Sequence, residues 1–256
     1  MRLHRLLAVL VGAAALSSCE KNGVQELTGA APGARIRFFN FGLNAPQLNF
    51  YAGANKVTAV NSTSGTEATT GIAYGGVGAG GFYSSVTPGP YDLTGRIAAT
   101  VDKDLVVSTL NATLVDGKAY SLYTSGLYNT TTKQVEAFIV EDDYSLTIDF
   151  TRSYVRFVNA IYNSQPMTLY VKDRVTNVET VITGTVPYKG ASAFTPVPNG
   201  VYDLSVRLPG SSTSTIVRTE VSFSAGKVYT VSARGDITVT STTATNRPFL
   251  DNTANQ

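Results

Sequence analysis

Leu114-Val-Asp-Gly-Lys-Ala-Tyr-Ser-Leu122 and Phe223-Ser-Ala-Gly-Lys-Val-Tyr-Thr-Val231 are two versions of one stretch. In each version an apolar strand end leads into a Gly-Lys turn, and the next strand then starts with a tyrosine near its beginning. Tyr120 matches Tyr229 at an offset of 109 residues, and the flanking sequence matches itself at similar offsets. The sequence therefore predicts two copies of one β-rich unit.

The remaining strands recur in the same order in both copies. Each copy has an Arg-Phe-x-Asn strand, a proline before a short apolar strand, and a proline-containing turn before a Tyr-Asp-Leu strand. Turn residues recur every 8–15 residues, and no helical periodicity of useful length appears. This spacing predicts an all-β protein of tandem antiparallel β-sandwiches. The matched segments are Arg35–Asn40 with Tyr154–Asn159, Pro46–Phe50 with Pro166–Tyr170, and Pro88–Leu93 with Pro198–Leu204.

This order of motifs, found twice, resembles the bacterial family called domain of unknown function 4397. The resemblance covers residues 34–143 and 153–240 and implies Ig-like sandwiches in secreted or lipid-anchored proteins; it implies no active site. We predict a signal peptide over 1–18, a lipidated cysteine and flexible tether over 19–33, a first sandwich over 34–148 and a second over 152–242. A polar C-terminal tail is expected over 243–256, after a weak last strand near Ile237–Thr240.

The first 18 residues have the features of a lipoprotein signal peptide. The apolar run Leu6–Leu16 is too short to span a bilayer as a helix. It ends in Leu16-Ser-Ser-Cys19, which resembles a lipobox and implies cleavage before Cys19 and acylation of that cysteine. An ordinary signal peptide is the alternative. Glu20 stands where the best-known inner-membrane retention signal has Asp, so we expect a periplasmic or surface-exposed protein of the outer membrane.

The composition of the mature chain excludes several classes of chemistry. Cleavage removes two arginines and leaves 18 basic and 18 acidic residues, so no net positive charge favours nucleic acid. His4 is the only histidine and Cys19 the only cysteine, which excludes Ser-His-Asp and Cys-His catalysis, zinc sites built on His or Cys, and disulfides. We therefore expect no catalytic residues, no bound metal, no cofactor and a non-enzymatic protein.

Three further patterns have a functional and a structural interpretation. Gly76-Val-Gly-Ala-Gly-Gly81 satisfies G-x-G-x-x-G, but a strand-like segment follows instead of a helix, so we expect no nucleotide and a mobile hairpin loop. Glu141, Asp142 and Asp143 could ligate a cation or serve a glycosidase; a solvated strand end or an interdomain edge is the preferred interpretation. The tyrosines at repeat-equivalent positions could bind sugars, but a core role with the hydroxyl at the sheet edge is preferred.

Two expectations come from comparing the copies. Arg37 and Arg156 alternate outward, as do Asp92 and Asp203, so each unit could carry an exposed cross-strand ion pair. The first copy is longer than the second by six residues between Phe50 and Tyr74 and by two more before Phe82. Because loops accept insertions more easily than strands, the extra length is either neutral or marks a binding surface.

We therefore predict a binding, adhesion or structural module of the cell envelope whose partner is a surface glycan or protein. A carboxylate-dependent glycan-active enzyme and a carbohydrate-binding module are the alternatives. The candidate ligand-binding residues lie in the two longer loops: Asn55, Thr63, Thr70, Gly76, Gly78 and Gly81.

Overall fold

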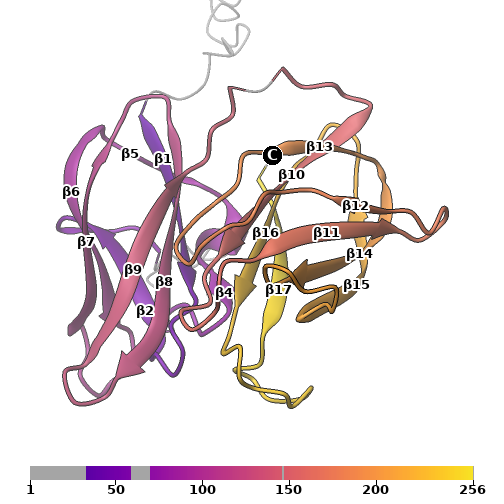
Figure 1. The fold of residues 1–256 in the computed structure, drawn as a ribbon. Helices are drawn as coiled ribbons and strands as arrows, with labels where there is room; N and C mark the ends of the chain where they lie inside the picture. The colour runs from indigo at the N-terminus through magenta and orange to yellow at the C-terminus, as the bar shows by residue number, and fades with distance from the viewer. Residues whose placement is uncertain (1–32, 59–69, 146, 256) are drawn as a thin grey trace, which may run out of the picture. The chain divides into compact units, whose positions relative to one another are not determined.

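Strands build both copies of the repeat. The structure is a computed structural model that describes residues 33–58, 70–145 and 147–255. No helix in those residues is long and apolar enough to cross a membrane. The elements, labelled in Figure 1 except for β3 and η2, are β1 Ala34–Asn40, β2 Leu48–Ala52, β3 Asn55–Lys56, β4 Gly76–Val77, the 3-10 helix η2 Gly78–Gly81, β5 Ser84–Val86, β6 Gly89–Ile97, β7 Val106–Leu114, β8 Ala119–Asn129, β9 Gln134–Glu141, β10 Arg152–Asn159, β11 Thr168–Asp173, β12 Glu179–Val181, β13 Thr195–Pro198, β14 Gly200–Arg207, β15 Ile216–Phe223, β16 Val228–Arg234 and β17 Phe249–Ala254.

Each copy is a sandwich of two sheets. The first copy has sheets β4-β1-β8-β9, with β5 also on β1, and β3-β2-β6-β7; the second has β13-β10-β16-β17 and β12-β11-β14-β15. The predicted fold of two tandem Ig-like sandwiches is confirmed. One detail differs from a purely antiparallel prediction, because β1 pairs with β8, and β10 with β16, in parallel. Both partners of each parallel pair are separated along the chain by strands of the opposite sheet, so no hairpin constrains their direction.

Each sandwich has its own apolar core between its sheets. In the first, Ile36 and Phe38 of β1 pack with Leu48 and Phe50 of β2, and the rings of Phe38 and Phe50 stack with centroids 5.0 Å apart. This is the alternation expected of strands with one face on a core. The corresponding core residues of the second sandwich are Val155, Phe157, Met167 and Leu169.

The repeated Gly-Lys turn forms as predicted in both copies. Gly117 and Gly226 have φ of +75° and +72°, a conformation that favours glycine. Two residues after the lysine of each turn, a tyrosine hydroxyl accepts a hydrogen bond from a backbone N–H five residues earlier. The distances are 3.2 Å for Tyr120 and 3.0 Å for Tyr229. The core role predicted for these tyrosines is thus confirmed at this pair of positions.

The first strand of each copy is buried on both of its faces. Phe39 and Phe41 point away from the core of the first sandwich and join Tyr123, Val158 and Ala160 in an apolar cluster shared by both copies. The rings of Phe39 and Tyr123 stack with centroids 4.5 Å apart. Residues 32–256 accordingly form one compact unit.

The C-terminal end of the second sandwich differs from its prediction. Residues 249–254, assigned to a polar tail, form β17 and pair antiparallel with β16, and Leu250 is fully buried in the core. Ile237–Thr240, predicted as a weak last strand, lies in a turn and the coil after it. The tail prediction was wrong for residues 249–254 because an edge strand needs few apolar side chains when its partner supplies the backbone hydrogen bonds.

Candidate functional site

A buried ionic cluster lies where the two sandwiches meet. Arg37 of β1 and Arg156 of β10 are each 1% exposed, and Asp142, just after β9, is 2% exposed. Arg156 Nη2 donates to Asp142 Oδ1, and Arg37 Nη2 lies 3.8 Å from Asp142 Oδ2. One carboxylate therefore serves two guanidinium groups, one from each copy. The expectation of exposed arginines was wrong, because the outward faces of β1 and β10 are covered by the opposite sandwich.

The exposed Arg–Asp pairs predicted for each copy do not form either. Arg37 stands on β1 and Asp92 on β6, and these strands belong to opposite sheets of the first sandwich. Asp92 accepts a hydrogen bond from the Asn111 side chain. In the second copy Asp203 lies 3.6 Å from a guanidinium nitrogen of Arg174. The strand alternation was assigned correctly, but not the sheet partners.

The two copies contribute matching parts to the ionic cluster. Arg37 Nε donates to Ser121 Oγ at 2.8 Å, and Arg156 Nε donates to Thr230 Oγ1 at 2.9 Å. The register Tyr120↔Glu141 and Tyr229↔Ala254 makes Asn255 the counterpart of Asp142. Asn255 Oδ1 accepts from Arg37 Nη2 at 2.9 Å. Because an amide replaces the second carboxylate, the cluster holds two cations and one anion.

Aromatic rings cover both arginines. Tyr83 lies 4.7 Å from the guanidinium carbon of Arg37, and Phe194 lies 4.8 Å from that of Arg156. The Tyr83 hydroxyl also donates to Asp142 Oδ2. Burial, and then the negative charge of Asp142, raise the pKa of Tyr83 far above its usual range. Tyr144 stacks on Phe194 with centroids 5.8 Å apart.

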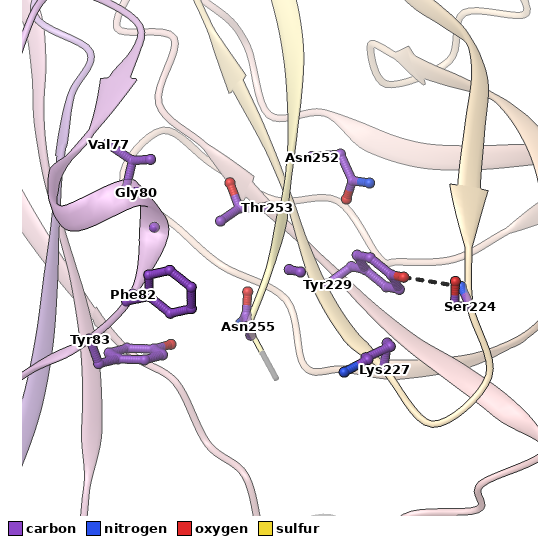
Figure 2. Close-up of a pocket in the computed structure, with 12 residues that line it drawn as sticks. Val77, Gly80, Phe82, Tyr83, Ser224, Lys227, Tyr229, Asn252, Thr253 and Asn255 are labelled. Carbon is purple, nitrogen blue, oxygen red and sulfur yellow. Dashed lines mark hydrogen bonds between the residues drawn. The ribbon is translucent and has the colours of Figure 1, made fainter. Parts of the chain in front are cut away.

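A groove of about 550 Å³ borders this cluster, a volume within the range of ligand-binding sites. Figure 2 shows Phe82 and Tyr83 on one side of it, and Tyr229, Ser224 and Lys227 on the other. Asn255, which binds Arg37, also lines the groove. The first sandwich thus contributes the η2 segment, and the second contributes β17 with its Gly-Lys turn.

The η2 segment is an insertion relative to the second copy. In the first copy, Val77 pairs with Phe39 and Ser84 pairs with Ile36. At the equivalent positions of the second copy, Ala191 bridges to Val158 and Thr195 pairs with Val155. Six residues separate Val77 from Ser84, but three separate Ala191 from Thr195. The first copy is therefore longer by three residues here, within 78–83, and Gly80, Gly81 and Phe82 from this stretch line the groove.

Register corrects two matches made from the sequence. The two extra residues before Phe82 were counted by matching Phe82 with Phe194. The counterpart of Phe194 is instead Tyr83, since Tyr83 and Phe194 each directly precede the strand that pairs with the first strand of their copy. The bridges Leu48↔Ile72 and Met167↔Val186 make Leu169, not Tyr170, the counterpart of Phe50. The earlier loop is then longer by five residues instead of six. A one-residue slip exchanges the two faces of a strand, which is why Leu169 is buried and Tyr170 is not.

Of the five candidate ligand-binding residues that the structure describes, only Gly81 lines the groove. Gly76 pairs with β1 in β4, and Gly78 is buried at the start of η2. Asn55 is exposed in β3, where it lines a separate hollow, and Thr70 is exposed. Thr63 and the proposed lipidation residue Cys19 lie outside the described residues. The Gly76–Gly81 stretch, expected as a mobile hairpin loop, forms β4 and η2.

The groove residues of the second copy were missed, because the turn carrying Lys227 seemed purely structural and β17 was assigned to the tail. They are Ser224, Lys227, Tyr229, Asn252, Thr253, Ala254 and Asn255.

The acidic run does not form a metal centre. Glu141 pairs with Lys118 at 2.7 Å, and Asp143 accepts from the backbone N–H of Ser145. Over residues 33–58, 70–145 and 147–255, no three His, Cys, Asp or Glu side chains come together in a way that could hold a metal ion. Of the two settings expected for this run, the solvated strand end describes Glu141 and Asp143, and the interdomain edge describes Asp142, which is buried where the sandwiches meet.

Fold and cluster together define a tandem β-sandwich protein with a buried ionic contact between its copies. Residues 153–256 match the family model described as Domain of unknown function (DUF4397), and the chain resembles that family over this segment. No curated protein matches the sequence significantly.

Two solved structures show distant likeness. The Bacillus anthracis TIE protein is 12% identical over 78% of this chain, at a TM-score of 0.23. This chain spans 33% of that protein. A Bacteroides fragilis protein described as a candidate cell adhesion protein is 10% identical over 87% of this chain and 97% of its own length, also at 0.23. Scores this low carry no argument about the function of this protein.

Proposed function

We propose that the mature protein is a non-enzymatic, lipid-anchored binding module of the cell envelope, and that its ligand lies in the groove beside η2. The observation that carries this proposal is the position of the insertion. The three extra residues of the first copy are placed where they form a wall of the groove, and Phe82, at the end of this wall, is 78% exposed. A neutral insertion is not expected to place an exposed aromatic ring beside a groove, whereas a ligand-binding loop is.

A glycan-active enzyme is the alternative, and the side chains of the groove argue against it. Glycosidases of the common mechanisms need two carboxyl groups flanking the scissile bond, about 5–9.5 Å apart. Among the residues that the structure describes, no acidic side chain lines this groove. Asp142, the carboxylate of the cluster that borders the groove, is held by two arginines and two hydroxyl groups. A buried carboxylate whose oxygens are already engaged in this way is not within reach of a substrate proton.

The binding proposal is tested by giving the first copy the shorter loop of the second. Residues 78–82, Gly-Ala-Gly-Gly-Phe, are replaced by the Ser-Ala of residues 192–193 in the full chain. Binding is measured on immobilised polysaccharides and on isolated bacterial envelopes, with release of sugar products measured in parallel. We expect the replacement to remove binding and leave the thermal transition nearly unchanged. Val175→Ser, at a residue 88% exposed in the second sandwich, is the matched control. Unchanged binding after the loop replacement, or product release by the wild type, would refute the proposal.

The anchor is tested separately. Because the lipobox-like sequence ends at Cys19, fatty-acid label should appear on the wild type and be absent from Cys19→Ser, which should also leave the membrane fraction. A wild-type protein without label would refute the anchor without bearing on the groove.

A further inference from the structure

We infer that the ligand of the groove is an acidic polysaccharide whose sugar rings carry carboxylates; this rests on the proposed function of the groove. The first observation is the charge of the lining side chains. Lys227 is the single charged side chain among the described residues that line the groove. It forms no ion pair with any residue that the structure describes. A groove lined in this way presents a local positive potential to its ligand.

The second observation is a difference between the copies at the same structural positions. Lys118 is the counterpart of Lys227 in the repeated Gly-Lys turn, and it pairs with Glu141 at 2.7 Å. The register makes Ala254 the counterpart of Glu141. The acid that neutralises the turn lysine in the first copy is therefore an alanine in the second, and this alanine lines the groove.

The same replacement occurs one residue further on. Asp142, which belongs to the first copy, neutralises the buried arginines. Its counterpart in the second copy, Asn255, is uncharged and lines the groove. Arg37, which donates to Asn255, has a second guanidinium nitrogen, Nη1, that is buried without a hydrogen-bond partner among the described residues. Two consecutive acids of one copy are thus absent from the groove side of the other. Both losses leave positive charge next to the groove, which favours an anionic ligand.

The uncharged lining indicates a sugar. Phe82 presents an exposed ring at the groove, and aromatic faces suit the apolar faces of sugar rings. Thr253 and Ser224 supply hydroxyl groups and Asn252 an amide, groups that can both donate to and accept from sugar hydroxyls. Asn252 Oδ1 is buried without a partner among the described residues. An acidic peptide would satisfy the charge, but it makes less use of these neutral donors and acceptors.

The main comparison of the test is between sugar oligomers with charged carboxylates and the same oligomers with their carboxylates esterified. Oligomers of galacturonate and their methyl esters are titrated into the full chain in detergent, beside neutral polysaccharides and polyglutamate. We expect the acid form to bind at least about fivefold more tightly than the ester, a preference that salt reduces. Lys227→Met and Ala254→Glu should each remove this preference. Lys118→Met, the matched control, should retain it.

Each other outcome has a defined meaning. Equal binding of acid and ester, or a preference that survives Lys227→Met, overturns the charge inference and leaves the binding proposal standing. Polyglutamate binding that depends on Lys227, without uronate binding, overturns the sugar assignment. If no polysaccharide binds and isolated envelopes do not bind either, the inference and the proposed function both fail. Circular dichroism of every variant separates these outcomes from loss of folding.

Discussion

Removing the single carboxylate of the buried cluster is the sharpest perturbation that the fold offers. Asp142→Asn preserves the size of the side chain but leaves Arg37 and Arg156 without a counter-ion. The carboxylate also accepts hydrogen bonds from the Ser121 and Tyr83 hydroxyls. Breaking a buried ion pair by removing one partner costs about 3–5 kcal/mol, because the remaining charge stays out of water. We therefore expect the free energy of unfolding to fall by about that amount.

The pseudo-equivalent position provides an internal control for this prediction. Asn255→Asp alone places a carboxylate within reach of Arg37 and balances the charge of the cluster, so it should be neutral or stabilising. Combined with Asp142→Asn, it moves the single negative charge to the other copy and should recover about half or more of the loss.

Urea unfolding followed by tyrosine fluorescence and far-ultraviolet circular dichroism measures all three variants. A loss below about 1 kcal/mol for Asp142→Asn would refute the reasoning, since it would mean that water reaches the arginines. A double variant as unstable as Asp142→Asn alone would also refute it.

Three further predictions concern stability. Burial raises the pKa of Tyr83, Tyr123 and Tyr144. The stability that these groups contribute is therefore present below about pH 10, the pKa of tyrosine in the unfolded chain, and is lost as the pH rises above it. In a pH titration, tyrosinate absorbance should show groups that ionise only when the protein unfolds. Gly117→Ala should cost about 1–2 kcal/mol of unfolding free energy, because its φ of +75° is unfavourable for alanine; an added Cβ meets no atom within 4 Å, so no steric clash contributes. Gly184→Ala, at a position that is equally open but has no positive φ, should cost nothing in the same urea assay. Deleting residues 249–256 should remove the hydrogen-exchange protection of the β16 amides that face β17, and protection equal to that of the full chain would contradict the strand assignment.

Local patterns predicted the hairpins well, and contacts distant in the sequence were not predicted. The turn before Tyr120 and Tyr229 depends on neighbouring residues, so the sequence contains what is needed to recognise it. Arg37 was placed correctly on the outward face of its strand, but nothing local shows that another copy covers this face. Asp142 likewise appears as one acid in a run of three, and its burial depends on contacts with β1 and β10 that the local sequence does not show.

The groove was predicted in part for the same reason. Loop lengths compared between the copies pointed to the segment ending at Gly81, because an insertion is visible without a structure. The opposite wall comes from β17, whose polar sequence is compatible with a tail as well as with an edge strand. The replacement of two acids by Ala254 and Asn255 can be recognised only from the strand register, which identifies Glu141 and Asp142 as their counterparts.

The position of Asp142 limits where the chain can be divided into separate repeats. The residue follows the last strand of the first copy, yet it accepts a hydrogen bond from Arg156 of the second. A gene fragment that begins at residue 153, where the family match starts, would encode this arginine without its counter-ion and with Val158 and Ala160 uncovered. The segment that the family match covers is therefore shorter than the segment that keeps the charges of the buried cluster together.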